Sequence, residues 1–245
     1  MRGIITLHSV DQHGSVISIS PNQLDSLLDS IEKSGHKIVA LSELLRHPGI
    51  PDRIAITFDD ALASVAEEGL PLLARRGLVA AVFVVTGRVG GDNAWPGQPA
   101  AIPGMSTMGW GELEALAEAG WEIGSHSTTH ANLTTLTDDQ IDDEIGLAHA
   151  TITERLGRAP EVFAYPYGAS NPKVTRATGL HHRFGLGGRM ALLDSAVDHP
   201  LDLPRIDGFY LRPFSVHRWF GQPVMASWLS LRRRARELRE RKLTP

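Results

Sequence analysis

Short apolar runs alternate with segments of helical periodicity along most of the chain. This alternation is typical of βα units arranged around a mostly parallel sheet. The run 79–85 is continuous and rich in valine, as expected for a strand that is covered on both faces. The pattern therefore predicts an α/β fold. The expected strands lie at 4–8, 37–40, 54–58, 79–85, 121–123, 162–165 and 203–206.

Capping residues predict where several helices begin and end. Ser20 and Pro21 supply an N-cap and a first-position proline, and a stripe of leucines follows them. The Thr-Asp-Asp-Gln sequence at 137–140 has the spacing of a capping box, and Gly157 is placed to end the helix that follows. Residues 86–107 are rich in Gly and Pro and predict a long surface loop, whereas 180–200 are ambiguous. Further helices are expected at 71–76, at 109–119 and from 223 onwards.

The length of 245 residues fits one large α/β domain or two small ones. No repeat, low-complexity tract or strong linker divides the sequence. We therefore expect one domain over residues 1–222 and a basic C-terminal helix over residues 223–245. The run 231–242 carries seven cations and two anions. Such runs are usually solvated helix faces, and contact with a membrane surface or an anionic partner is the alternative.

Composition restricts the partners and the metal ligands that can be expected for this chain. The net charge of −4 gives no signal for nucleic acid, and no nucleic-acid partner is expected. The chain has no cysteine, so any metal must be bound by His, Asp or Glu. The apolar run at the start is too short for a signal peptide, and no stretch approaches the roughly 20 apolar residues of a membrane span. The sequence as written predicts a cytoplasmic protein, and an exported form stays open.

Two pairs of polar residues follow predicted strands. Asp59 and Asp60 come directly after the run 54–58, and His126 and His130 follow the run 121–123. Catalytic groups of parallel α/β folds gather at such strand ends. Two imidazoles and one carboxylate would leave a metal with an open position, and the second carboxylate would be free to act on a substrate. The combination is typical of a catalytic metal site.

Each pair also has an ordinary interpretation. Two adjacent aspartates commonly form a helix N-cap, and a spacing of four between histidines arises by chance in a chain with 11 of them. The metalloprotease helix signature His-Glu-x-x-His is absent, because Ser127 follows His126. Neither pair is specific by itself.

Three motifs in series are specific. Thr57-Phe58-Asp59-Asp60 comes first, the His126 to His130 segment second, and the sequence Phe-Ala-Tyr-Pro-Tyr-Gly at 163–168 third. In this order they resemble the polysaccharide deacetylases, the NodB-homology or carbohydrate esterase family 4. The resemblance extends from about residue 4 to about residue 207. It implies an irregular (β/α)7 barrel and a hydrolase that removes N-acetyl groups from amino sugars of a poly- or oligosaccharide, releasing acetate.

The resemblance also assigns roles to residues. It implies that Asp60, His126 and His130 bind a divalent metal, typically zinc, and that Asp59 is the general base. It implies that the turn at Tyr167 shapes the groove and that its backbone N–H helps to bind the oxyanion. An N-acetylated carbohydrate is the implied substrate.

The chain departs from the usual motifs of the family in three ways. Ala61 stands where a glycine commonly follows the aspartates, and Ala164 stands where many members have an arginine that orients the catalytic aspartate. The late motifs that carry the general acid are missing after Tyr167. A circularly permuted subgroup, which includes deacetylases of poly-N-acetylglucosamine and other exopolysaccharides, places its acid histidine on the first strand. His8 matches that position.

The permuted subgroup also has a counterpart of the segment 203–206, which contains Arg205. Arg205 either supplies the cation that Ala164 leaves missing beside Asp59 or is an ordinary surface arginine. Trp95, Trp110 and Tyr167 are candidates for stacking on sugar rings, and for Trp110 core packing is an equal alternative. Two other functions stay open: deacetylation of a small or lipid-linked N-acyl sugar, and glycan binding without hydrolysis.

Overall fold

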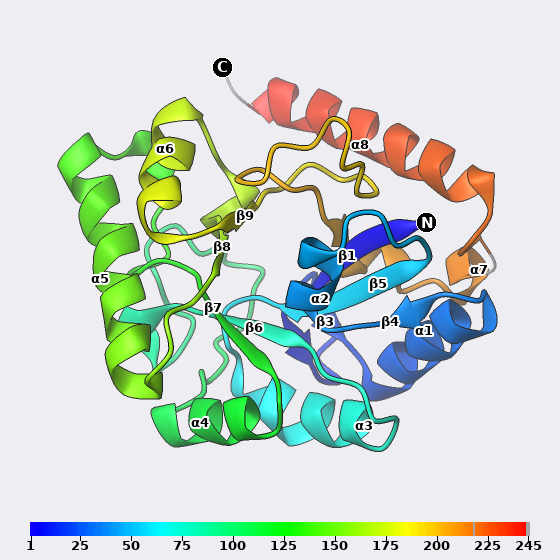
Figure 1. Cartoon of the computed structure of the whole chain (residues 1–245), viewed down its shortest axis with the longest axis horizontal. Coiled ribbons are helices and arrows are strands. Elements are labelled where there is room, and N and C mark those ends of the chain that lie inside the picture. The colour runs from blue at the N-terminus through cyan, green and yellow to red at the C-terminus, as the bar shows by residue number, and fades with distance from the viewer. Residues whose placement is uncertain (218, 244–245) are drawn as a thin grey trace.

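A curled parallel sheet with helices packed around it forms the body of the protein (Figure 1). The computed structural model describes residues 1–217 and 219–243. Along the sheet the strand order is β10-β1-β5-β6-β7-β8-β9, with β4 paired to β5 off this path, and all these pairings are parallel. The strands are β1 (Arg2–Leu7), β4 (Lys37–Ile38), β5 (Arg53–Phe58), β6 (Ala81–Val84), β7 (Glu122–Ser125), β8 (Val162–Ala164), β9 (Phe184–Leu186) and β10 (Ile206–Asp207). A separate two-stranded sheet consists of β2 (Ser9–Val10) and β3 (Ser18–Ile19).

The two ends of the curled sheet are joined by irregular backbone. The amide of Leu203 donates to the carbonyl of Gly185, and the amide of Gly187 donates to the carbonyl of Leu203, both over 2.8 Å. Residues 203–205 thus connect β9 to β10, which pairs with β1. The predicted α/β fold with an irregular barrel is confirmed.

The two helices with predicted N-caps begin at the predicted positions. Ser20 and Thr137 each form a capping box with the glutamine three residues later, and Gly157 ends its helix with a φ of 66°. Figure 1 shows α1, α3, α4, α5 and α6 outside the sheet. The α-helices are α1 (Pro21–Lys33), α2 (Leu41–Arg46), α3 (Leu70–Ala74), α4 (Trp110–Glu118), α5 (Asp138–Leu156), α6 (Pro172–His181), α7 (Phe214–His217) and α8 (Pro223–Leu243).

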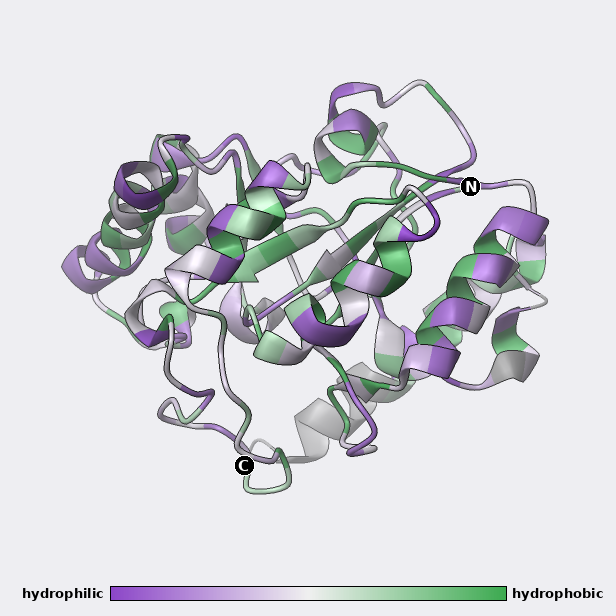
Figure 2. Ribbon diagram, turned by 90° about the horizontal axis from the view of Figure 1, so that it is seen from below, coloured by the Kyte–Doolittle hydropathy of each residue, from purple (hydrophilic) through white to green (hydrophobic). Residues whose placement is uncertain are grey.

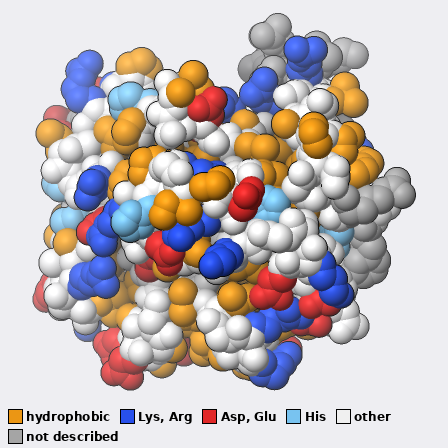
Figure 3. Space-filling view, turned by 45° about the vertical axis from the view of Figure 1, so that its right-hand side comes forward, with side chains coloured by type: hydrophobic (Ala, Val, Ile, Leu, Met, Phe, Trp, Pro, Cys, Tyr) orange, Lys and Arg blue, Asp and Glu red, His pale blue; other side chains and the backbone are white. Residues whose placement is uncertain are grey.

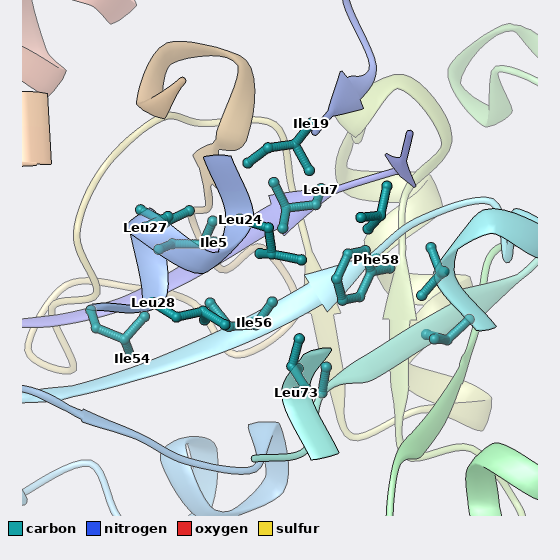
Figure 4. Packing of buried hydrophobic residues seen from close by; sticks show 14 of the residues in the cluster. Ile5, Leu7, Ile19, Leu24, Leu27, Leu28, Ile54, Ile56, Phe58 and Leu73 are labelled. Carbon is teal, nitrogen blue, oxygen red and sulfur yellow. The ribbon is translucent and has the colours of Figure 1, made fainter. Parts of the chain in front are cut away.

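The main core lies between α1 and the strands β1 and β5. Leu24, Leu27 and Leu28 of α1 are fully buried against residues of both strands, including Ile5 and Ile56 (Figure 4). Figure 2 shows the strands as mostly hydrophobic and the helices as hydrophobic on one side and hydrophilic on the other. Truncating one such leucine to alanine would lower the free energy of unfolding by about 2–5 kcal/mol. The packing of α1 therefore stabilises β1 and β5, whose carboxyl ends carry polar residues.

Some elements differ from the predictions. The ambiguous segment 180–200 contains β9, which is only three residues long and has Gly185 at its centre, so its apolar signal is weak. The last strand was predicted at 203–206 but is found at Ile206–Asp207, because Pro204 has no N–H to donate to a ladder. The sequence also did not predict α2 and α6 as helices.

The C-terminal helix α8 begins at Pro223 as predicted and buries Met225 and Leu229 in the main core. The division of the chain at residue 222 stays a prediction, and the basic side chains at 236–242 lie outside the described side chains. On the face shown in Figure 3, acidic and basic side chains are interspersed. Among the described residues, no helix has the length and apolar character required to cross a membrane.

Candidate metal centre

One hollow at the carboxyl ends of the strands collects the predicted catalytic and metal-binding residues. The lining includes all seven predicted site residues, namely His8, Asp59, Asp60, His126, His130, Tyr167 and Arg205. They come from the ends of β1, β5, β7 and β8 and from the segment before β10. Their convergence follows from the parallel sheet, because the carboxyl ends of parallel strands meet at one edge.

Asp60, His126 and His130 form a buried cluster with the geometry of a metal site. Oδ1 of Asp60 lies 3.4 Å from Nε2 of His126 and 3.3 Å from Nε2 of His130. The three side chains offer one ligand atom each within 4.8 Å of one another, and Oδ1 of Asp60 has no hydrogen-bond partner among the described residues. A buried carboxylate oxygen that faces two imidazole nitrogens is a suitable donor set for a divalent cation.

Unusual backbone conformations place these ligands. Asp60, Ala61 and His130 have φ values of 71°, 50° and 62°, in the left-handed region. The sharp turn after β5 points Asp59 and Asp60 to different partners. The turn also explains why glycine is common after the aspartates, since a left-handed residue with a Cβ costs about 1–2 kcal/mol. Ala61 adopts that conformation here.

The His126 ring is held by a backbone acceptor. Nδ1 of His126 lies 2.7 Å from the carbonyl oxygen of Ala164, at the end of β8. A carbonyl can only accept, so Nδ1 carries the hydrogen and the lone pair of Nε2 faces Asp60. This is the tautomer that binding a metal through Nε2 requires.

Electrostatics favour the ionised carboxylate in the cluster. Burial by itself would raise the pKa of Asp60, but contacts with His126 and His130 bring it below its usual range. Burial would lower the pKa of His126, but Asp60 and the charge of Asp59 raise it above its usual value. The cluster therefore holds negative charge beside imidazoles, where a cation can take the place of a proton.

Asp59 does not join the cluster and instead pairs with Arg205. Nη1 of Arg205 donates to Oδ1 of Asp59 over 2.7 Å and to Oγ1 of Thr6 over 3.0 Å. Both side chains of the ion pair are 5% exposed. Burial would raise the pKa of Asp59, but the charge of Arg205 and of nearby histidines lowers it. The interpretation of Arg205 as an ordinary surface arginine is wrong.

His8 and Tyr167 lie on the walls of the hollow. His8 directly follows β1 and lines the hollow together with Asp59 and Asp60. Tyr167 has a φ of 59°, is 42% exposed, and packs edge-on against His130 with ring centroids 4.7 Å apart.

The structure changes the interpretation of the two tryptophans. Trp95 is only 3% exposed and packs against His130 with tilted rings, so its ring does not present a free face to a sugar. Trp110 lies on α4 against the main core, with Arg155 over its ring, and does not line the hollow. Further lining residues, including Gln98, Ile102, Met190 and Asp207, were not predicted. They come from irregular segments or short strands, where periodicity gives no signal.

Comparisons with known proteins agree with this geometry. The family described as polysaccharide deacetylase matches residues 46–182, and the chain belongs to that family. A poly-β-1,6-N-acetyl-D-glucosamine N-deacetylase of Staphylococcus aureus is 24% identical over 222 residues, covering 79% of this chain and 73% of the relative.

Two solved structures share the fold. IcaB from Ammonifex degensii aligns with a TM-score of 0.73 and 21% identity, covering 90% of this chain and 98% of that one. The Streptococcus pyogenes deacetylase PplD, solved in complex with acetate, aligns with a TM-score of 0.71 and 18% identity, covering 84% of this chain and 91% of that one. These structures support the predicted fold, and the family match over residues 46–182 confirms the predicted family.

Proposed function

We propose that the protein is a metal-dependent carbohydrate N-deacetylase, which hydrolyses the acetamide of an amino sugar to acetate and a free amine. The observation that carries the proposal is that the two adjacent aspartates contact different partners. Asp60 faces the two imidazoles, whereas Asp59 faces Arg205 and lines the same hollow. A site with a free carboxylate beside a three-ligand cluster suits hydrolysis.

The proposed metal is a divalent cation held by Asp60, His126 and His130. Two neutral imidazoles and one carboxylate suit Zn²⁺, and Co²⁺, Ni²⁺ or Mn²⁺ can replace it. When bound, such an ion supplies Lewis acidity to a water molecule and to the acyl oxygen. The rest of the chemistry is assigned to side chains of the hollow.

Asp59 is proposed as the general base. It accepts a proton from the attacking water as the water oxygen bonds to the acyl carbon. Its low pKa keeps it ionised at neutral pH, and the hydrogen bond from Arg205 fixes the orientation of its carboxylate. The backbone N–H of Tyr167 is the proposed donor to the oxyanion.

His8 is proposed as the general acid. The C–N bond breaks only if the nitrogen receives a proton, because an amide anion is too basic to leave. His8 lines the hollow with Asp59 and is not part of the metal cluster. A protonated imidazole can donate that proton through its ring N–H.

The proposed substrate is a polymer or oligomer of N-acetylated amino sugars. The relative from Staphylococcus aureus is named for poly-β-1,6-N-acetyl-D-glucosamine, and the position of His8 directly after the first strand supports the permuted exopolysaccharide subgroup. Acetate release should therefore be measured on β-1,6-linked and β-1,4-linked N-acetylglucosamine oligomers and on the monosaccharide, with added zinc.

Three outcomes separate the candidate functions. Faster release from oligomers than from the monosaccharide supports the proposal. Faster release from the monosaccharide would indicate a small-sugar deacetylase. Oligomer binding without acetate release, by protein that has bound zinc, would indicate a glycan-binding member. Asp59→Asn is the matched control, because it should retain the metal ligands but lack the base.

A further inference from the structure

The loop at residues 91–107 is anchored across its base. Its arms pair through the bridge between Asp92 and Ser106, and the amide of Asn93 donates to the carbonyl of Met105 over 3.0 Å. The buried Asn93 side chain accepts from the amide of Met105 over 2.8 Å and donates to the carbonyl of Pro103 over 3.1 Å. This 91–107 loop therefore holds its inner residues in defined positions over the metal centre.

Trp95 of the 91–107 loop packs on a proposed metal ligand. The centroids of the Trp95 and His130 rings are 4.3 Å apart, with an interplanar angle of 31°. Tyr167 contacts the same imidazole edge-on at 4.7 Å. The imidazole of His130 is thus confined by two aromatic rings that come from distant segments of the chain.

The two histidines of the cluster are oriented by different means. His126 donates from Nδ1 to the carbonyl of Ala164. Nδ1 of His130 is buried and has no hydrogen-bond partner among the described residues. Metal-binding histidines are usually oriented through their second nitrogen. For His130, the described neighbours that restrict the ring are the aromatic rings of Trp95 and Tyr167.

Gln98 of the same loop brings a polar group to the hollow. It lines the hollow together with Asp59 and Tyr167, and its Nε2 is buried with no hydrogen-bond partner among the described residues. The loop is fixed at this point, because the amide of Gln98 donates to the carbonyl of Trp95 and the Tyr167 hydroxyl donates to the carbonyl of Pro96. An unpaired buried amide costs about 1–3 kcal/mol, which a polar group of a bound ligand would offset.

We propose that the 91–107 loop belongs to the working site, with Trp95 as a positioning residue for His130 and Gln98 as a contact to the substrate. The ligand chemistry for Gln98 is a hydroxyl or acyl oxygen of an N-acetylated sugar. The inference rests on the proposed metal site and substrate class. The role of Trp95 is tested by metal affinity and the role of Gln98 by oligosaccharide binding, neither of which requires turnover. Either role can therefore be refuted independently of the proposed activity.

Metal affinity tests the role of Trp95. Zinc and cobalt dissociation constants should be measured by competition with a chromophoric chelator for the wild type, Trp95→Phe and Trp95→Leu. Trp95→Leu keeps an apolar side chain without a ring and should bind about 10–100-fold more weakly, with a changed Co²⁺ absorption spectrum. Trp95→Phe should recover most of the affinity. Trp110→Ala is the control and should bind as the wild type does.

Equal metal affinity and equal Co²⁺ spectra in folded Trp95→Leu and wild type would overturn the role of Trp95. Equal losses in Trp95→Leu and Trp95→Phe would overturn it too, because the effect would then not depend on a ring. If Trp95→Leu fails to fold, the comparison of Trp95→Phe with the wild type decides: a Co²⁺ spectrum and an affinity close to wild type support the role, and loss of metal binding overturns it.

Binding of oligosaccharide tests the role of Gln98. Calorimetry with a β-1,6-linked N-acetylglucosamine oligomer should be done in the Asp59→Asn background, which prevents turnover. Adding Gln98→Ala should weaken oligomer binding about tenfold, the equivalent of one lost hydrogen bond, and leave the zinc dissociation constant unchanged. Gln222→Ala, an exposed glutamine outside the hollow, is the control. Unchanged oligomer affinity in the Gln98→Ala variant would overturn this assignment.

Discussion

Arg205 and Asp59 form a buried ion pair although 146 positions separate them in the sequence, with Nη1 2.7 Å from Oδ1. The pair joins the end of β5 to the segment that closes the barrel. Many relatives are expected to place an arginine at the position of Ala164, and here the cation comes from the irregular segment directly before β10 instead. Removing one partner of a buried ion pair leaves the other charge uncompensated.

The first prediction concerns that pair. Arg205→Met should lower the free energy of unfolding by about 3–5 kcal/mol and reduce kcat, because Asp59 loses both its charge partner and its orientation. Chemical denaturation and the rate of acetate release measure the two effects. The double variant Arg205→Met, Asp59→Asn should recover part of the lost stability. A stability loss in the double variant equal to the sum of the single losses would contradict the coupling.

The second prediction concerns His8. His8→Ala should fold and bind zinc as the wild type does, because His8 is not in the metal cluster. Its kcat should fall by about 10²–10⁴, the usual contribution of a positioned acid. Steady-state acetate release and metal analysis test this, with His13→Ala as a control at an exposed loop position. A wild-type rate in His8→Ala would remove both the acid assignment and the permuted-subgroup interpretation.

The third prediction concerns metal affinity and pH. The pKa of His126 is raised by Asp60 and Asp59 despite its burial, so a proton competes with the metal for this imidazole. Zinc affinity should fall as the pH falls through that pKa, by about tenfold per pH unit for one displaced proton. Chelator competition between about pH 8 and pH 6 measures the slope. Proton uptake, rather than release, on zinc binding would contradict the prediction.

The fourth prediction concerns His182, a buried residue that is not part of the metal cluster. Its ring packs against Phe163 and His149. Burial lowers its pKa from 6.5 to about 3. The unfolded chain therefore binds the proton more readily than the folded chain between these values. The stability that this group contributes is complete above about pH 6.5 and is lost as the pH falls toward 3, by up to about 1.4 kcal/mol per pH unit.

Denaturation at several pH values tests this in the wild type and in His182→Leu. The variant should show a smaller loss of stability on acidification. His13→Gln, at an exposed position, should follow the wild-type curve. Parallel curves for His182→Leu and the wild type would show that this imidazole does not titrate differently in the two states.

The sequence predicted the residues at the strand ends better than the conformation of the irregular segments that connect the strands. Asp59 and Asp60 follow a strand with a clear apolar run, and His126 follows the shorter run 121–123; these signals were sufficient to place the three residues in one hollow. The partner of Asp59 could be stated only as one of two alternatives. A strand was predicted at 203–206, but Pro204 interrupts the hydrogen-bond pattern and the strand is found only at Ile206–Asp207. The direction of the Arg205 guanidinium therefore could not be predicted from a strand period.

For the 91–107 loop, the sequence predicted the kind of structure but not where its side chains pack. Its Gly and Pro content predicted a surface loop, and Trp95 was assigned to sugar stacking. Its actual position depends on contacts with His130, and a loop without hydrogen-bond periodicity carries no signal for such long-range packing. The short strand β9 was missed because three residues with a central glycine cannot establish a period.

The most direct measurement is a zinc titration of metal-free protein with acetate release as the readout. We expect no release without metal, a linear rise with added zinc and a plateau at one equivalent per chain, in line with the single Asp60, His126 and His130 cluster found among the described residues. Asp59→Asn should bind the same equivalent and release little acetate. A full rate in the metal-free protein, or in Asp59→Asn, would contradict the account.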